Sequence, residues 1–106
     1  MADIKFSSQW LGARSYNEVE KLQLQYVRAC LKQPSIQIFS CEHTKTISCG
    51  VRGDLKRDLV SSEDFLRTAG FETVFSQRGG ETTLHNPGQL VIYPVVPLRE
   101  IELGVR

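Results

Sequence analysis

The sequence predicts an α+β fold, with a mixed β-sheet and flanking helices, in a single domain over residues 1–106. Three observations lead to this prediction. Short runs rich in β-branched and aromatic residues recur along the chain, and one long segment has helical periodicity. A glycine-rich stretch, residues 78–88, then leads into a nearly continuous apolar run. The length of 106 residues is close to the common size of one domain.

The first third of the chain predicts a strand followed by a helix. Residues 5–11 lean apolar and are expected to form a strand that Gly12 closes. Ser15 and Glu18 fit the capping box, in which a Ser N-cap is followed three residues later by Glu. Apolar residues then recur at three- and four-residue steps to about Gln33, after which Pro34 ends the helix. The side chains expected on the buried stripe are Tyr16, Val19, Leu22, Tyr26, Val27, Cys30 and Leu31.

The remainder alternates short strands with loops and one short helix. Strands are expected at 35–41, 46–50, 71–76 and 89–96, the last buried on both faces, with Pro94 implying a bulge or an edge. Residues 42–45 are expected to form a polar break and residues 51–58 a charged loop. Ser61 or Ser62 would cap a short helix that ends at Gly70. Residues 98–106 suggest the first turns of a helix, so the domain is expected to be incomplete at its C-terminus.

The composition and charge of the chain argue against several classes of function. The net charge is +1 with both signs scattered, which gives no electrostatic basis for binding nucleic acid or an anionic membrane. No apolar run approaches the ~18 residues of a membrane span. The N-terminus lacks the features of a secretory signal or a transit peptide. The three cysteines have no C-x-x-C spacing, which indicates reduced thiols in a cytoplasmic protein.

The glycine-rich stretch has the composition of a ligand-contacting loop. Paired glycines cost backbone entropy in an ordered structure and are useful where the main chain takes positive φ or lies against a ligand. Arg78 before the pair and His85 behind it add a fixed cation and a titratable group. A structural role for His85, as a hydrogen-bonded loop histidine, stays equally open.

The motif in this stretch resembles that of a known family. The family pattern is Arg-Gly-Gly, two variable residues, Thr-Tyr-His-Gly-Pro-Gly-Gln-Leu-Val, one variable residue, and Tyr-Pro. The positions in register are Arg78, Gly79, Gly80, Thr83, His85, Pro87, Gly88, Gln89, Leu90, Val91, Tyr93 and Pro94. Glu42-His43 followed by Gly50 also matches the family at the same spacing. The sequence therefore resembles the N-terminal half of the lipoyl(octanoyl) transferases, whose fold is shared with biotin and lipoate protein ligases.

This resemblance implies an acyltransferase of lipoate biosynthesis and protein lipoylation. Such enzymes move an octanoyl or lipoyl group from acyl carrier protein to a lysine of lipoyl domains, in 2-oxoacid dehydrogenases or a glycine-cleavage protein. No metal and no cofactor are implied. The family's catalytic Cys and Lys lie in its C-terminal half, so no catalytic residue is assigned in this chain and a C-terminal half-chain is a candidate partner. The residues expected to bind substrate are Arg78, Gly79, Gly80, Glu81, Thr82, Thr83, Leu84 and His85.

Two residues depart from the family pattern, and one of them, Leu84, together with the missing Cys and Lys of the family, favours an alternative. Leu84 replaces a Tyr, which would remove an aromatic wall and a hydroxyl next to His85, and Asn86 replaces a Gly, although Asn tolerates left-handed backbone. The alternative is a non-catalytic acyl-binding subunit or a degenerate fragment of such a transferase. A lipoate- or biotin-ligase relative is a weaker option because no further Gly/Lys phosphate loop is present.

Cys49 is the candidate nucleophile within the chain, with Lys45 four residues before it. On a strand, residues four apart are separated by ~13 Å, too far for the lysine to activate the thiol. Cys49 is therefore expected to be a small packed hydrophobe.

Overall fold

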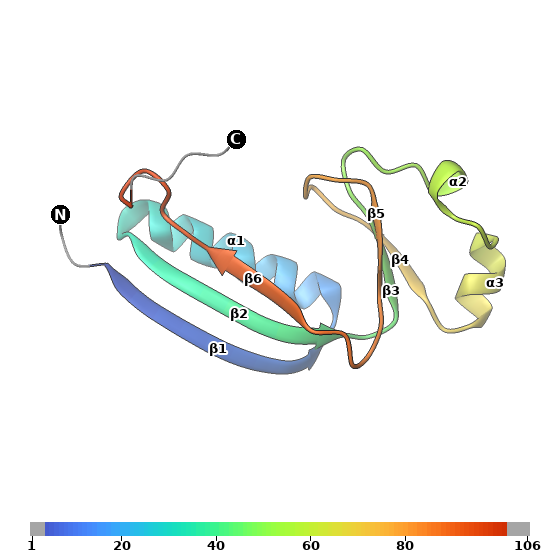
Figure 1. Cartoon of the computed structure of the whole chain (residues 1–106), viewed down its shortest axis with the longest axis horizontal. Coiled ribbons are helices and arrows are strands. Elements are labelled where there is room, and N and C mark those ends of the chain that lie inside the picture. Colours follow the sequence, from blue (N-terminus) through green and yellow to red (C-terminus); the bar gives the residue numbers. More distant parts are fainter. Residues whose placement is uncertain (1–3, 102–106) are drawn as a thin grey trace. The chain divides into compact units, whose positions relative to one another are not determined.

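The computed structural model describes residues 4–101, which divide into two compact units (Figure 1). The first unit contains the chain up to residue 41 together with the chain from residue 90 on, and the second contains residues 42–89. Both combine strands with helices, so the predicted α+β class is confirmed. Within residues 4–101, no helix has the length and apolar character needed to cross a lipid bilayer.

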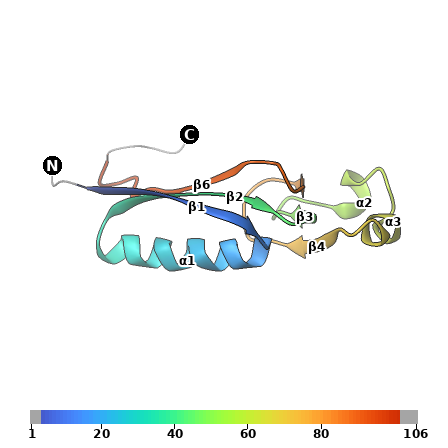
Figure 2. The same ribbon diagram turned by 90° about the horizontal axis from the view of Figure 1, so that it is seen from below.

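The first unit is a three-stranded sheet covered on one face by a long helix (Figure 2). Its elements are β1 (Lys5–Arg14), α1 (Tyr16–Lys32), β2 (Ser35–His43) and β6 (Val91–Val95). The strand order is β1-β2-β6, and β6 runs antiparallel to β2, with Phe39 opposite Tyr93. The ring of Tyr26 on α1 meets Phe39 edge-on at 4.8 Å. The buried apolar residues of this unit are Tyr16, Val19, Phe39, Cys41 and Val95.

The start of α1 confirms the predicted capping box. Ser15 Oγ accepts a hydrogen bond from the Glu18 backbone N–H at 3.2 Å, and Glu18 Oε1 accepts from the Ser15 N–H at 3.3 Å. The predicted buried stripe is only partly correct. Val27 is 44% exposed and Leu31 is 81% exposed, since burial within residues 4–101 concentrates at the N-terminal half of the helix.

Strand β6 is not buried on both faces, contrary to the expectation for residues 89–96. Ile92 is 57% exposed and Pro94 is also exposed, whereas Val95 is buried. The strand alternates because one face packs toward α1, and β2 is its neighbour in the sheet order. The edge position anticipated from Pro94 is confirmed. The helix expected over 98–106 falls largely outside the described residues; residues 98–101 form a turn.

The second unit is a three-stranded sheet of order β4-β3-β5 with two short helices. The central strand β3 is parallel to β4 and antiparallel to β5. All four residues of β3 are buried, which makes it the core of this unit. Its elements are β3 (Thr46–Cys49), α2 (Leu55–Asp58), α3 (Glu63–Thr68), β4 (Glu72–Phe75) and β5 (Thr82–His85).

Three local predictions for this region need correction. Glu42 and His43 do not form a polar break but continue β2, and His43 is 1% exposed. Residues 51–58 are not entirely loop, because the Asp54 carboxylate caps a helical turn by accepting from the N–H groups of Lys56 and Arg57. The glycine-rich stretch is also not one long loop, since β5 lies inside it. The Ser62 cap of α3 was predicted correctly.

Candidate functional site

The predicted site residues lie on a sheet with two different faces. Along a strand, successive side chains point to opposite sides, and residues paired across strands share a side. Ile47 pairs with Leu84 and Cys49 with Thr82, which defines an apolar face. The polar face alternates with it and carries the side chains of Thr46, Ser48, Thr83 and His85. Site residues from one continuous motif are therefore divided between two surfaces.

Arg78 anchors the polar face. Its Nη2 donates hydrogen bonds to the Ser48 carbonyl oxygen at 2.7 Å and to Ser48 Oγ at 2.9 Å, and Nε reaches the same hydroxyl at 3.3 Å. Nη1 donates to the carbonyl of Gly79 at 2.9 Å, and Nη2 also to that of Glu81 at 3.0 Å. Charge-assisted bonds of this kind are stronger than neutral ones. The guanidinium thus binds the glycine loop to the central strand.

A second set of contacts, made by backbone N–H groups of residues 50–52, holds the same loop. The N–H of Gly50 donates to Glu81 O at 2.8 Å, that of Val51 to Arg78 O at 3.0 Å, and that of Arg52 to Gly80 O at 3.0 Å. A Cβ at Gly50 would lie 2.6 Å from Gly80 O, so only glycine permits this approach. Each of the four successive backbone carbonyl groups of residues 78–81 therefore accepts a hydrogen bond.

His85 lies on the polar face and is buried, with 6% of its surface exposed. Its Nε2 is 2.9 Å from Ser48 Oγ, and its ring meets that of His43 edge-on at a centroid distance of 5.2 Å. Burial, and secondarily the nearby His43 and Arg78, lowers the pKa of His85 to about 4. At neutral pH the ring is uncharged, so it cannot serve as a fixed cation for an anionic ligand.

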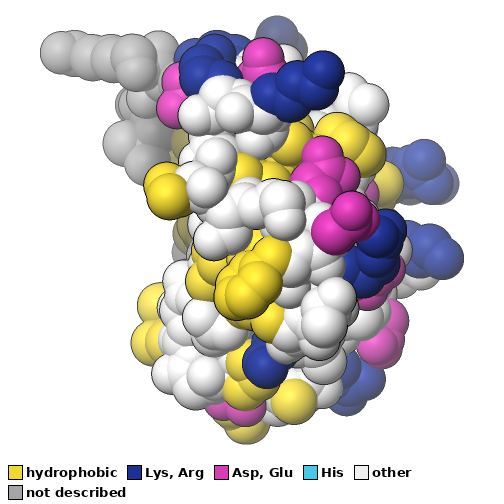
Figure 3. Space-filling model, turned by 90° about the vertical axis from the view of Figure 1, so that its right-hand side faces the viewer, with side chains coloured by type: hydrophobic (Ala, Val, Ile, Leu, Met, Phe, Trp, Pro, Cys, Tyr) yellow, Lys and Arg dark blue, Asp and Glu magenta, His cyan; other side chains and the backbone are white. Residues whose placement is uncertain are grey.

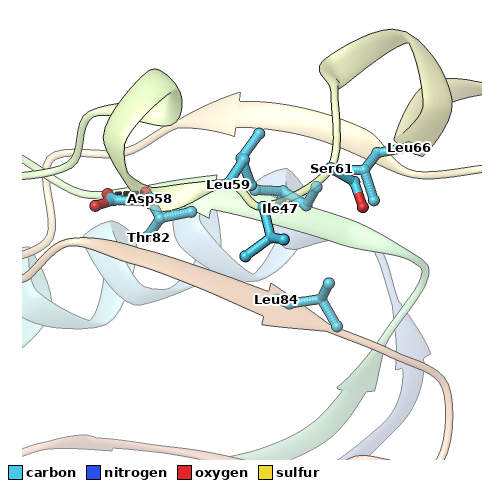
Figure 4. Close-up of a pocket in the computed structure, with 8 residues that line it drawn as sticks. Ile47, Asp58, Leu59, Ser61, Leu66, Thr82 and Leu84 are labelled. Carbon is cyan, nitrogen blue, oxygen red and sulfur yellow. Dashed lines mark hydrogen bonds between the residues drawn. The ribbon is translucent and has the colours of Figure 1, made fainter.

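The apolar face borders a hollow of about 290 Å³, at the small end of the ~300–1,000 Å³ typical of ligand pockets. Its lining residues are Ile47, Asp58, Leu59, Val60, Ser61, Leu66, Thr82 and Leu84. In Figure 4, Ile47 and Leu84 from adjacent strands surround this space together with Leu59 and Leu66. Figure 3 turns the side that carries α2 and α3 toward the viewer, where hydrophobic side chains show among charged ones.

One hydrogen-bond cluster ties α2 to this face. Thr82 Oγ1 donates to Asp58 Oδ2 at 2.6 Å, and Arg57 Nε donates to Asp58 Oδ1 at 2.8 Å. The hydrogen bonds from Arg57, then Thr82 and the Asp54 N–H, hold the pKa of Asp58 well below its usual range. Arg57 also lies 3.7 Å from the Glu81 carboxylate. The charged carboxylate at Asp58 therefore fixes the start of β5 against α2.

The eight predicted site residues thus occupy three settings. Residues 78–81 form the braced loop, Thr82 and Leu84 face the hollow, and Thr83 and His85 lie on the polar face. The expectation that Leu84 would alter the wall next to His85 is wrong. Neighbouring positions on a strand point to opposite sides, so Leu84 borders the hollow while His85 bonds Ser48.

Comparison with known proteins decides the family. Residues 15–106 match the family described as the lipoyl protein ligase A/B catalytic domain. The chain belongs to this family. Its similar relatives include octanoyltransferases of Maridesulfovibrio salexigens, 32% identical over 97 residues, and Syntrophobacter fumaroxidans, 35% identical over 96 residues. A third, from Koribacter versatilis, is 36% identical over 99 residues.

These matches cover most of the chain and less than half of each relative. They span 91%, 90% and 90% of these residues, but 45%, 42% and 39% of the respective octanoyltransferases. Membership of the lipoyl protein ligase A/B catalytic domain family confirms the resemblance drawn from the glycine-rich motif. It is also consistent with the α+β architecture of both units.

Cys49 is packed as the sequence suggested. Its side chain is 3% exposed, and the Lys45 ammonium group instead donates to Ala69 O at 3.1 Å. Within residues 4–101, Cys30, Cys41 and Cys49 are not joined in disulfide bonds. Burial raises the pKa of Cys41, which further disfavours a thiolate there.

Sequence reasoning missed the residues that support the motif from elsewhere in the chain. Ser48, Gly50 and Asp58 each contact the segment 78–85, but they lie 24 to 37 positions away from their partners. The glycine at position 50 was noted as a family match without a role. Asp54 was a signal for α2, because Asp N-caps commonly open helical turns.

Proposed function

We propose that this chain provides the acyl-binding part of an octanoyl transferase acting in the cytoplasm. The donor is octanoyl-acyl carrier protein, and the acceptor is a lysine on a lipoyl domain of a 2-oxoacid dehydrogenase or glycine-cleavage protein. The observation that carries the proposal is the motif of residues 78–94, which matches that of the transferases and folds here as a braced loop followed by β5. A lipoyl group is the alternative acyl group for the same site.

The braced loop suits a thioester carbonyl. In a trans peptide the C=O and the following N–H point in opposite directions. The carbonyl groups of residues 78–80 are bound by Val51, Arg78 and Arg52, so the N–H groups of residues 79–81 are directed away from those partners. Gly80 adopts φ +94°, which only glycine takes readily. Backbone N–H groups fixed in this way stabilise developing negative charge on an oxygen.

Arg78 acts in this proposal by holding the loop. Its donors are directed at carbonyl and hydroxyl oxygens of Ser48, Gly79 and Glu81. Replacement by lysine would keep the charge and lose the planar fork that serves several acceptors at once. Both Arg78→Ala and Arg78→Lys are therefore expected to lose octanoyl-pantetheine binding.

A suitable control is Arg67→Ala on α3. Arg67 is exposed and its ion-pair partner is Asp64, so its loss leaves the loop contacts in place. Binding of octanoyl-pantetheine to purified chain would be followed by calorimetry, with circular dichroism to check folding. Unchanged binding by Arg78→Lys would contradict the bracing role.

The second candidate function is a non-catalytic acyl-binding subunit. It is favoured by the packing of Cys49, the candidate nucleophile within these residues, which is 3% exposed. A thioester intermediate needs a nucleophilic thiolate, and Cys49 is buried. The test supplies octanoyl-acyl carrier protein and a lipoyl domain to the purified chain, alone and with a candidate C-terminal half-chain.

Transfer by the chain alone would refute the subunit proposal. Transfer only with the half-chain would support a divided transferase, and binding without transfer in either mixture would favour the non-catalytic role. If octanoyl-pantetheine does not bind at all, both proposals fail.

A further inference from the structure

Ser48 connects the two functional groups of the polar face. It lies on the central strand β3 and has no exposed surface. Its hydroxyl oxygen is 2.9 Å from Arg78 Nη2, 3.3 Å from Arg78 Nε and 2.9 Å from His85 Nε2. Within residues 4–101, these two side chains are the partners that the structure gives to this hydroxyl. The direction of each bond can therefore be worked out by counting hydrogens.

A guanidinium group carries hydrogens on every nitrogen and accepts none. The contacts from Arg78 to Ser48 Oγ are therefore donated by the arginine and use the lone pairs of the hydroxyl. One hydrogen remains on the oxygen, and His85 Nε2 is the acceptor at 2.9 Å. Nε2 can accept only if it carries no proton, so the ring proton resides on Nδ1.

The other neutral tautomer of His85, protonated at Nε2, is energetically unfavourable. If His85 were protonated at Nε2, it would donate to Ser48 and the serine hydrogen would face only donors. Three N–H groups would then point at one hydroxyl oxygen, which has two lone pairs, and this crowding disfavours the Nε2-protonated ring; the burial of Nδ1 is common to both tautomers. A doubly protonated ring has the same defect and would also bring a second positive charge close to Arg78.

We propose that Ser48 is a positioning residue of the acyl site, which with Arg78 holds His85 as the neutral ring protonated at Nδ1. This inference rests on the proposed acyl-binding function for its consequence, but not for its geometry. Because Nε2 accepts the hydrogen of Ser48, the proton nearest to this nitrogen is that of the serine hydroxyl and not one of a bound ligand.

The first test is direct observation of the two ring nitrogens in the full chain. Nitrogen-15 NMR separates protonated from unprotonated ring nitrogens, and the chain has two histidines, His43 and His85. Signals lost in a His85→Gln variant belong to His85. We expect a protonated Nδ1 and an unprotonated Nε2 at neutral pH. A protonated Nε2 would overturn the inference, whatever the chain binds.

The second test removes the hydroxyl. Ser48→Ala should redistribute the His85 tautomers, and Ser48→Thr, which restores a hydroxyl, should retain the wild-type pattern. The matched control is Thr46→Val, which deletes a hydroxyl on the same face; Thr46 pairs with His85 across the strands but donates to Thr44 O. An unchanged tautomer in a folded Ser48→Ala chain would contradict the role of Ser48.

Octanoyl-pantetheine binding separates this inference from the proposed function. If wild-type chain shows the expected tautomer and binds no acyl probe, the acyl-binding function fails while the assignment of His85 stands. If the probe binds, Ser48→Ala should weaken it at least tenfold and Ser48→Thr should largely restore it. Equal affinity in wild type and Ser48→Ala would refute a positioning role in ligand binding.

Discussion

Gly50 lies directly against the loop of residues 78–81, and this contact supports a quantitative prediction for Gly50→Ala. A Cβ there would lie 2.6 Å from Gly80 O, 2.8 Å from Arg78 Nη1 and 3.0 Å from Glu81 O. Two of these three neighbours are backbone atoms, so the loop carrying residues 78–81 must move away. The N–H bonds from Gly50 to Glu81 and from Arg52 to Gly80 would lengthen with it.

The expected loss of stability in Gly50→Ala follows from these contacts. Overpacking of a close contact costs ~1–3 kcal/mol, and each weakened hydrogen bond adds ~1 kcal/mol or less. We expect Gly50→Ala to lower the free energy of unfolding by about 2–4 kcal/mol. With a urea slope of about 2 kcal/mol per molar, a loss of about 3 kcal/mol lowers the unfolding midpoint by about 1.5 M.

Gly79→Ala provides the matched control for stability. A Cβ at Gly79 meets no atom within 4 Å among the described residues, so the same change in the same loop should alter stability by about 0.5 kcal/mol or less. Both variants would be unfolded in urea and followed by circular dichroism. An unchanged midpoint for Gly50→Ala, or an equal loss in both, would refute the reasoning.

Three further predictions concern other parts of the chain. Ser15→Ala removes the helix cap and should cost ~1 kcal/mol, seen as a fall in Tm of about 4–8 °C; no change would rule out a contribution from the capping box. His85, whose pKa falls from 6.5 to about 4 on folding, takes up its proton first in the unfolded chain. Stability should therefore decrease as pH falls from 6.5 toward 4, and a His85→Gln variant should lack that part of the urea-midpoint profile. Leu84→Tyr should leave the unfolding midpoint unchanged or raise it, because a hollow of about 290 Å³ lies beside the side chain, and a loss above 1 kcal/mol would argue against that space.

Local chemistry made several elements predictable. The Ser15–Glu18 capping box and Ser62 each specify a helix start through hydrogen bonds to residues three positions away, so a single sequence reveals them. The glycine-rich motif similarly identified the family. The β-strand inside it was overlooked, although the paired threonines at 82 and 83 favour extended backbone.

Other features depend on contacts that sequence order does not reveal. Gly50 needs to be glycine because Gly80 approaches it, and Ser48 matters because Arg78 and His85 converge on it. The predicted burial of Val27 and Leu31 failed for the same reason, since both side chains are exposed. Helical periodicity identifies an apolar stripe, but its burial depends on what packs against each turn.

Because side chains alternate along β5, the motif residues in this strand form two interleaved sets that face different surfaces. The side chains of Thr83 and His85 lie on the polar face, while those of Thr82 and Leu84 line the hollow. Substitution within one set can proceed without disturbing its counterpart. A one-residue deletion before the strand would have the opposite effect: it would exchange the two sets between surfaces at once. In this segment, spacing is thus under tighter constraint than the identity of any single side chain facing the hollow.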